Sequence, residues 1–283
     1  MTFFIFGAGY SGRAFALAQS TPVYGTTRDA TQFGALKAAN VIPFLFHGKS
    51  LDALLAAALE KTTHLIISIA PDTRGDLILA LPDLQQKIPN LQWIGYLSTV
   101  GVYGNHDGRW VNETAPCRTI LPRNRKRIEV EKGWQHFAEK HNIPLAILRL
   151  AGIYGPGRNA FIKLQQGKAH RIIKPGQVFN RIHTADITGV IKHLADRKQN
   201  GIFNVCDNEP APPQDVIAFA AGLMGIEPPP EIPFEKSGFN PMIHSFYGDN
   251  KRVSNELLLK TGYHPVYPDY RQALTSMWQS KHW

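Results

Sequence analysis

Residues 2–12, TFFIFGAGYSG, join a short apolar run to three closely spaced glycines. The run predicts a strand, the glycines predict a tight turn, and the apolar positions after them predict a helix. In this context the spacing G-x-G-x-x-G indicates a phosphate-binding turn. Gly7 makes the turn, Gly9 lets the backbone approach a pyrophosphate, and Gly12 lets helix and strand pack closely. The helix N-terminus offers N–H groups to the phosphates. The expected phosphate contacts are Gly7, Gly9, Tyr10, Ser11 and Gly12.

The same alternation of strand and helix continues through the first half of the chain. Continuous apolar strands separated by helices are typical of a parallel sheet with helices on both faces. The expected strands are 23–26, 41–46, 64–69, 91–97 and 145–150, and the expected helices are 30–38, 51–60, 77–87 and 125–141. The sequence therefore predicts an α/β fold, a doubly wound parallel sheet of the Rossmann type with a smaller C-terminal substrate lobe.

The regular alternation of strands and helices ends at about residue 151, after which Gly and Pro separate shorter elements. We expect residues 1–155 to form an NAD(P)-binding Rossmann domain. Residues 156–283 are expected to form mainly a substrate-binding lobe, partly interleaved with that domain. Candidates for lining its cleft, although core packing explains the aromatic ones equally well, are Phe179, Asn180, Arg181, Phe246 and Tyr247.

The end of the second predicted strand determines the cofactor preference. An NAD enzyme usually carries an acidic residue there, where it binds the ribose hydroxyls. This chain has Gly25-Thr26-Thr27-Arg28 at that place. Neutral threonines followed by an arginine can accept a 2′-phosphate, which a carboxylate would repel. We predict that Thr27 and Arg28 bind NADP, with NAD as the second choice; the alternative is that Arg28 simply caps a loop.

Composition excludes several classes of protein. No apolar stretch approaches the roughly 20 residues that span a bilayer, and residues 3–6 lack a basic leader, so we expect no membrane segment and no signal peptide. Cys117 and Cys206 are isolated, which favours a reducing compartment and argues against a disulfide framework or a metal site. The net charge of +9 leaves nucleic acid as an alternative partner. The basic cluster at 118–132 lacks interleaved aromatics, however, so we expect a cytoplasmic protein without that partner.

Four further segments resemble motifs of a known family. They are Ile69-Ala70-Pro71, LSTVGVYG at 97–104, LRLAGIYGPGR at 148–158 and RIHTADI at 181–187. Together with the glycine turn they are similar to the NAD-dependent epimerase/dehydratase group of the extended or atypical short-chain dehydrogenase/reductase superfamily, through most of the chain. The turn departs from the family pattern at Phe6, where the family has another glycine. The resemblance implies a nicotinamide cofactor that Ala70 and Pro71 also contact.

The resemblance also implies catalytic residues. The Ser or Thr that orients the substrate in such enzymes stands four residues before the tyrosine of V-Y-G, which makes it Thr99 here. Their Y-x-x-x-K pair carries the proton chemistry, but the aligned positions hold Arg123 and Arg127. A guanidinium does not release its proton near neutral pH, so Arg123 cannot replace a tyrosinate. Arg127 can still hold ribose hydroxyls or phosphate.

Other residues were weighed as the missing acid or base. Tyr103 is the candidate catalytic acid, with packing as its alternative. Ordinary loop or surface roles are expected for the remaining candidates, His106, Asp107, Cys117, Lys126 and Tyr154. His183 and Asp186 match a family position that is usually structural, where the aspartate caps or anchors the following helix.

Two functions remain open at this point. One is an NADP-preferring oxidoreductase or epimerase that acts on a carbonyl or hydroxyl of a small polar, sugar-derived substrate. The other is a non-catalytic NADP(H)-binding redox sensor or regulator, which the loss of the tyrosine favours. By analogy with related proteins we also expect a homodimer formed through helices that flank the sheet.

Overall fold

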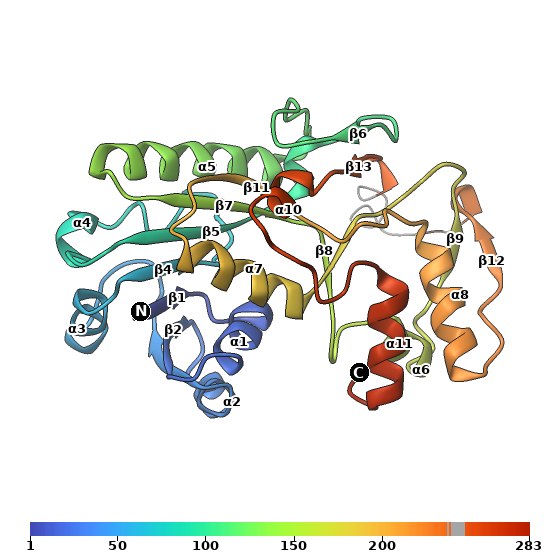
Figure 1. Cartoon of the computed structure of the whole chain (residues 1–283), viewed down its shortest axis with the longest axis horizontal. Helices are drawn as coiled ribbons and strands as arrows, with labels where there is room; N and C mark the ends of the chain where they lie inside the picture. The colour runs from blue at the N-terminus through green and yellow to red at the C-terminus, as the bar shows by residue number, and fades with distance from the viewer. Residues whose placement is uncertain (237, 239–246) are drawn as a thin grey trace. The chain divides into compact units, whose positions relative to one another are not determined.

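The computed structural model describes residues 1–236, 238 and 247–283, and within them a seven-stranded parallel sheet is the central element (Figure 1). The strand order is β11-β7-β5-β4-β1-β2-β3. Their bounds are β1 Phe3–Phe6, β2 Val23–Thr27, β3 Val41–Leu45, β4 His64–Ile67, β5 Trp93–Thr99, β7 Leu145–Leu150 and β11 Gly201–Val205. The predicted doubly wound α/β fold is confirmed.

The described chain divides into two compact units. Unit 1 comprises residues 1–102, 120–149 and 187–203, and unit 2 comprises residues 103–119, 150–186 and 204–283. After residue 155 the chain returns to unit 1 for most of a helix and most of the last strand, and residues 103–119 belong to unit 2 although they precede residue 155. The division into a Rossmann domain and a substrate lobe stays a prediction. No helix in the described part of the chain is both long and apolar enough to cross a membrane.

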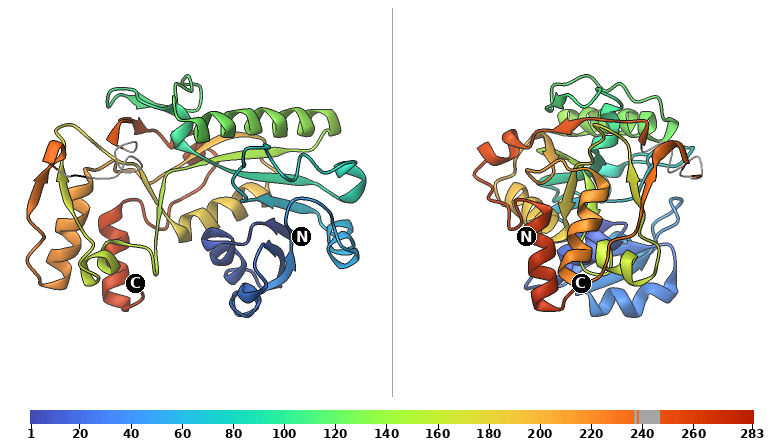
Figure 2. Two further views of the ribbon diagram at one scale, coloured as in Figure 1. Left: turned by 180° about the vertical axis from the view of Figure 1, so that it is seen from behind. Right: turned by 90° about the vertical axis from the view of Figure 1, so that its right-hand side faces the viewer.

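Helices cover both faces of the sheet in unit 1. On one face lie α3 (Ala53–Glu60), α4 (Leu84–Lys87) and α5 (Pro122–His141), which share a core with Phe4 and Phe6 of β1. On the other lie α1 (Tyr10–Leu17) and α7 (Thr184–Asp196); the ring of Phe15 on α1 packs edge-on against Phe3 at 5.0 Å. Figures 1 and 2 show α5 and α7 on opposite sides of β5 and β7. Phe3 and Phe4 thus point to opposite faces of the sheet, and because helices cover both faces, the first strand is apolar throughout.

Unit 2 is built from short strands and three packed helices. The strands form three parallel pairs: β6 (Trp110–Val111) with β13 (Arg252–Val253), β8 (Gly152–Tyr154) with β10 (Arg181–His183), and β9 (Arg171–Ile173) with β12 (Glu231–Pro233). The helices are α6 (Ala160–Gln165), α8 (Pro213–Met224) and α11 (Tyr270–Ser280), whose apolar faces share one core around Phe161. The remaining elements are η1 (Ala30–Gln32), α2 (Phe33–Ala38), η2 (Val100–Tyr103), η3 (Phe234–Lys236) and α10 (Glu256–Lys260).

The predicted helix at 77–87 is wrong for most of its length. Only α4 is helical there, because the Asp76 carboxylate accepts the backbone N–H groups of Ile78 and Leu79, each at 2.9 Å, and holds that segment in a turn. Asp83 then takes a left-handed conformation with φ of 52° just after Pro82. Ile78 and Leu81 are thus buried in a loop, which the helical spacing alone did not reveal.

Candidate functional site

The glycine turn joins β1 to α1, and each of its glycines meets a different steric demand. Gly7 has φ of +86°, and a Cβ placed on it would lie 2.8 Å from Ile69 Cγ1. A Cβ on Gly12 would lie 3.3 Å from Ile5 Cγ2, so the helix packs closely on the strand there. At Gly9 the nearest atom beyond the adjoining residues would be the Gly7 carbonyl oxygen, 4.0 Å away. The turn therefore leaves open space beside Gly9, where a pyrophosphate needs the missing side chain.

The end of β2 holds this turn in place. Gly7 N donates to Thr26 Oγ1 and Ala8 N donates to the Thr26 carbonyl, both at 2.9 Å. Thr26 is itself buried, at 1% exposure, which makes it a structural residue. The first turn of α1 follows Gly9, which provides no capping side chain. The positive end of the α1 dipole thus faces the open side of the turn, which suits an anion.

Two charged residues follow Thr26 and Thr27, the exposed Arg28 and the hydrogen-bonded Asp29. Arg28 is exposed and has no hydrogen-bond or ion-pair partner among the described residues. The neighbouring Asp29 accepts the Thr31 N–H at 2.9 Å and so caps η1. Hydrogen bonds from the Thr31 side chain and from this N–H lower the pKa of Asp29. Thr27 Oγ1 accepts the Asp29 N–H at 3.2 Å. Sequence reasoning did not consider Asp29, and the structure shows its carboxylate engaged with its own helical turn.

The loops that follow four neighbouring strands come to one edge of the sheet. Because β5, β4, β1 and β2 are adjacent and run parallel, their carboxyl ends share that edge. The glycine turn follows β1 and Arg28 follows β2. Ala70 and Pro71 follow β4, next to Ile69 and hence next to Gly7. The carboxyl edge of a doubly wound sheet is where such folds bind ligands.

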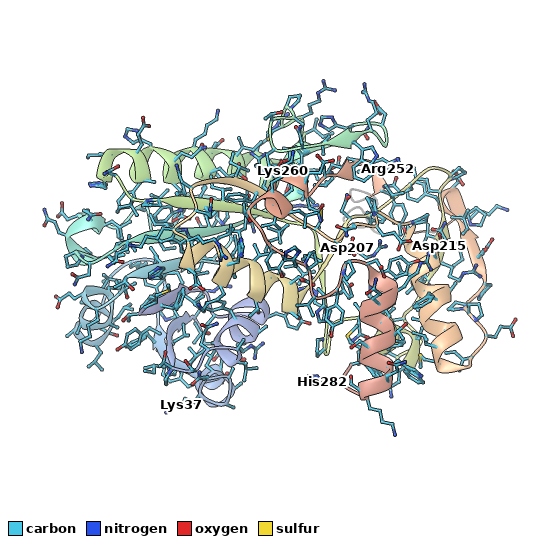
Figure 3. All side chains as sticks on the ribbon, in the orientation of Figure 1. Lys37, Asp207, Asp215, Arg252, Lys260 and His282 are labelled. Atoms are coloured by element: carbon cyan, nitrogen blue, oxygen red, sulfur yellow. The ribbon has the colours of Figure 1, made fainter. Side chains whose placement is uncertain are left out.

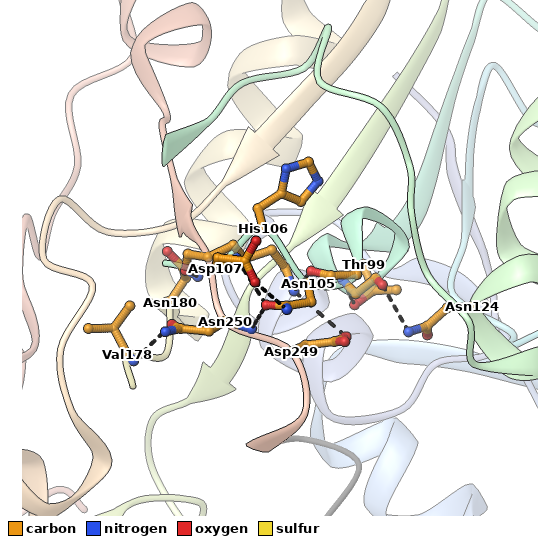
Figure 4. A network of polar contacts seen from close by, with 12 residues as sticks. Thr99, Asn105, His106, Asp107, Asn124, Val178, Asn180, Asp249 and Asn250 are labelled. Carbon is orange, nitrogen blue, oxygen red and sulfur yellow. Dashed lines mark hydrogen bonds and ion pairs between the residues drawn. The ribbon is translucent and has the colours of Figure 1, made fainter. Parts of the chain in front are cut away.

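Thr99 ends β5 at the same edge. It is half-buried, and its Oγ1 accepts the Gly101 N–H at 3.1 Å, which leaves the hydroxyl proton to be donated elsewhere. Gly101 is fixed in turn by Asn124 on the first turn of α5, whose Nδ2 donates to its carbonyl at 2.9 Å (Figure 4). Sequence reasoning did not identify Asn124, although it lies between the two arginines of interest.

Those two arginines have different surroundings. Arg127 is half-buried, and its Nη1 donates to the Leu97 carbonyl at 3.1 Å, which ties α5 to β5. Burial raises the pKa of both Asp76 and Tyr96, and the Arg127 charge offsets part of each shift. Arg123 lies exposed on the first turn of α5. Neither side chain can serve as a base near neutral pH.

A buried ion pair beneath this edge was missed entirely. Glu131 on α5 accepts from Arg149 on β7, with Nη2 to Oε2 at 2.7 Å and Nε to Oε1 at 3.3 Å. Ser98 on β5 donates to Glu131 Oε1 at 2.5 Å. The side chains of Arg149 and Glu131 are 6% and 3% exposed. The three residues join two strands to α5 directly below Thr99 and Arg127, so they position the site without belonging to it.

The remaining candidate acids and bases lie in unit 2 or on the surface. Tyr103 is fully buried and donates to Asn204 Oδ1 at 2.7 Å, the packing role that was its alternative. His106 is buried with Nε2 3.2 Å from the Pro116 carbonyl, and the exposed Lys126–Glu129 ion pair lies on α5. Cys117 is half-exposed. Tyr103 stays a prediction as an acid, but its hydroxyl already has a buried acceptor.

Asp186 anchors a distant segment. It accepts the N–H groups of Val266 and Tyr267 and the hydroxyl of Tyr263, all within 3.1 Å. Residues 263–267 are therefore held against the start of α7. The expected structural role of Asp186 fits this geometry, with the difference that the anchored segment lies 77 or more residues away along the chain.

Unit 2 also contains a polar pocket of about 490 Å³. Asn105 and Asn250 bridge its two sides: Asn250 N donates to Asn105 Oδ1 at 3.0 Å, and Val178 N donates to Asn250 Oδ1 at 3.2 Å (Figure 4). Asp107 accepts from Asn105 Nδ2 at 2.8 Å. Among the predicted cleft residues, Phe179 packs edge-on against Tyr247 at 5.2 Å. Asn180 is bonded to the backbone at residues 251 and 253, and Phe246 lies outside the described residues.

Comparison with known proteins identifies relatives with substantial sequence identity. No protein-family model matches the sequence. A solved structure of a conserved, functionally unknown protein from Silicibacter pomeroyi DSS is 44% identical, with a TM-score of 0.90, and the match covers 99% of this chain and 98% of that one. Protein YeeZ of Escherichia coli strain K12 is 33% identical over 192 residues, which are 66% of this chain and 61% of the relative. The match thus spans less than two thirds of the length of that curated relative.

More distant solved structures show the same fold with nicotinamide cofactors. UDP-glucuronic acid 4-epimerase from Bacillus cereus, in complex with NAD, is 15% identical with a TM-score of 0.77 over 99% of this chain and 98% of that one. The human epimerase family protein SDR39U1, with NADPH, is 16% identical with a TM-score of 0.68 over 99% of each chain. The resemblance to this group that the motifs indicated is thereby confirmed at the level of the fold.

Proposed function

The chain belongs to the same family as the conserved Silicibacter pomeroyi protein, and on that premise we propose that it is an NADP(H)-dependent oxidoreductase or epimerase. Its fold is that of NAD-dependent epimerases and dehydratases of the extended short-chain dehydrogenase superfamily. The proposed substrate is a small polar molecule, sugar-derived, with a carbonyl or hydroxyl group. The predicted homodimer and cytoplasmic location stay predictions.

The open space beside Gly9 is the observation that carries the proposal. A turn between β1 and α1 whose central glycine has room for a ligand, next to an uncapped helix N-terminus, is suited to a dinucleotide pyrophosphate. Gly7, Tyr10, Ser11 and Gly12 complete that contact, and Ala70 and Pro71 lie beside it in the chain's fold.

The preference for NADP rests on the end of β2. Arg28 has no described partner, so its guanidinium is available for a 2′-phosphate, while the carboxylate of the neighbouring Asp29 accepts the Thr31 N–H. Thr27 contributes a neutral hydroxyl at the same place. An arginine fork matches a phosphate with two parallel hydrogen bonds, which supports NADP over NAD.

Bound NADPH would supply the hydride, and the chain's own groups would orient the acceptor. Thr99 keeps a hydroxyl proton that it can donate to a substrate carbonyl oxygen, since the bond from Gly101 N–H uses a lone pair of the hydroxyl and not its proton. Arg127 holds the α5 start against β5 and adds positive charge near the ribose position. Arg123 and Arg127 replace the Tyr and Lys of the family, so the proton comes from another donor, such as water.

Thr99 provides the test of catalysis. We expect NADPH oxidation with a member of a panel of aldoses, ketoses and their phosphates, with kcat falling at least tenfold in Thr99→Val and recovering in Thr99→Ser. NADPH binding should be unchanged in both variants. Turnover in Thr99→Val equal to wild type would remove Thr99 from the reaction centre.

The second candidate function, a redox sensor, is favoured by Arg123. Arg123 is exposed at the start of α5 and replaces the tyrosine that the family has at this position. A sensor would bind NADPH and NADP with different conformational outcomes and would turn over none of the panel. Limited proteolysis with each form of the cofactor separates the two functions, because a sensor requires different cleavage patterns.

A further inference from the structure

Unit 2 contains a second polar centre, built on the short strands β8 and β10. Tyr154 pairs with His183 and Gly152 pairs with Arg181, so the three side chains of this pair lie on one face. The Tyr154 and His183 rings meet edge-on at 5.3 Å. Gly152, opposite Arg181, adds no side chain to that face.

Arg181 uses only part of its hydrogen-bonding capacity. Its Nη1 donates to the carbonyls of Phe179 and Ala211 at 2.8 and 3.0 Å. Its other two nitrogens have no hydrogen-bond or ion-pair partner in the described ranges. The Tyr270 ring lies 5.9 Å from the guanidinium carbon and covers one side of it. A guanidinium presents five N–H donors, so most of its donors remain available to a ligand.

Four buried polar atoms around this arginine are left without a hydrogen-bond partner in the described parts of the chain. They are Tyr154 Oη, His183 Nε2, Asp207 Oδ2 and Tyr270 Oη. Asp207, labelled in Figure 3, is 2% exposed. Its backbone N–H donates to the Arg181 carbonyl at 2.7 Å, which joins it to β10. Buried polar groups in folded proteins are nearly always paired, so such a cluster indicates that something binds there.

The charges around the centre favour an anion on one side. Lys163 on α6 is exposed, and desolvation together with the charges of Arg181 and Arg158 lowers its pKa. Its Nζ has no hydrogen-bond or ion-pair partner among the residues that the structure describes. A second cation that interacts with Arg181 favours an anionic ligand.

Asp207 offers a partner for a hydroxyl group. Burial raises the pKa of Asp207 to about 8, against its ordinary 3.8, so the carboxyl is largely protonated at neutral pH. Its Oδ1 accepts the Glu209 N–H at 3.2 Å, which leaves Oδ2 for a ligand. Asp207 and Arg181 form no ion pair, although each charge affects the other's pKa. A group between them would satisfy both.

We propose that this centre binds a small ligand that carries an oxyanion and a hydroxyl group, with the oxyanion held by Arg181 and Lys163 and the hydroxyl by Asp207 and Tyr154. Sugar acids and sugar phosphates both have this chemistry. The inference rests on the proposed function only in naming this ligand the substrate, since binding itself needs no cofactor.

Isothermal titration calorimetry of the full chain without cofactor tests the inference. The probes are D-gluconate, D-glucose 6-phosphate and inorganic phosphate, with neutral D-glucose as the control. We expect at least one of the two sugar anions to bind with a Kd below about 10 mM and glucose not to bind. Binding of gluconate but not of glucose 6-phosphate would identify a carboxylate, and the reverse a phosphate. If neither sugar anion binds, the inference is wrong and the unpaired atoms hold water.

Two variants assign the contacts. Lys163→Gln should lower the affinity for the anion about tenfold. The control Lys260→Gln on α10, at a residue whose side chain is 75% exposed, should leave that affinity unchanged (Figure 3). Asp207→Asn should lower the affinity for the hydroxyl-bearing anion more than the affinity for inorganic phosphate. Arg181 itself supports two carbonyls, so its replacement is left out because it would disturb folding. Equal anion affinity in wild type and Lys163→Gln would overturn the assignment, and NADPH titrations of the same samples would show whether the proposed function fails independently.

Discussion

Glu131→Gln tests how the site is held together. The substitution keeps the shape of the side chain but removes the charge that faces Arg149, whose side chain is 6% exposed. Removing one partner of a buried ion pair costs about 3–5 kcal/mol, because the other charge stays buried without its counter-charge. That cost is a large share of the roughly 5–15 kcal/mol by which a folded chain is stable. Urea unfolding followed by tryptophan fluorescence measures it, with Trp134 on the same helix as a reporter.

The control for this variant is an exposed pair in the same unit. Lys192 and Asp196 on α7 form an ion pair with side chains 45% and 33% exposed. Asp196→Asn should cost less than about 1 kcal/mol. A loss of stability in Glu131→Gln as small as in Asp196→Asn would refute the reasoning. Replacing both Glu131 and Arg149 by apolar residues should restore much of the stability, since no buried charge then remains.

Three further results are expected. Gly9→Ala should abolish measurable NADPH binding while it changes the free energy of unfolding by less than about 1 kcal/mol, because the added Cβ meets only open space; urea unfolding and cofactor titration of one sample check both. In wild type the folded state retains the Asp207 proton up to about pH 8, whereas the unfolded chain loses it near pH 3.8. The free energy of unfolding should therefore fall as pH rises from 3.8 to 8, by at most about 1.4 kcal/mol per pH unit. Asp207→Asn should remove that contribution, and unchanged pH dependence would contradict the buried-carboxyl account. His64 acts in the opposite direction: burial lowers its pKa to about 4, so stability falls as pH drops from 6.5 towards 4, and His64→Phe should flatten that part of the profile.

The parts of the fold that were predictable are those encoded by neighbours in the sequence. Residues 3–12 contain the strand, the turn and the helix start, and each glycine shows the steric role that its spacing implied. The helix expected at 77–87 failed because Asp76 satisfies local N–H groups in a turn, a competition that apolar spacing does not report.

The parts that were not predictable depend on partners distant along the chain. Glu131 contacts residues 33 and 18 positions away, and no local signal distinguishes its carboxylate from those on the helix surface. Asp207 and Arg181 likewise meet across 26 residues through short strands that Gly and Pro obscure. Asp29 shows the converse case, since its carboxylate, next to Arg28, accepts the Thr31 N–H within its own helical turn.

Parallel titrations with NADPH and NADH of wild type, Arg28→Ala and Arg197→Ala test the central claim most directly. Arg197 is an exposed arginine just after α7, at the opposite edge of the sheet, and serves as the matched control. The account predicts that wild type binds NADPH more tightly than NADH. Arg28→Ala should lose about 10- to 150-fold in NADPH affinity, the equivalent of a charged hydrogen bond, with NADH unaffected and Arg197→Ala like wild type. NADPH affinity unchanged in Arg28→Ala would contradict the assigned cofactor preference, and no binding of either cofactor to wild type would contradict the proposed function as a whole.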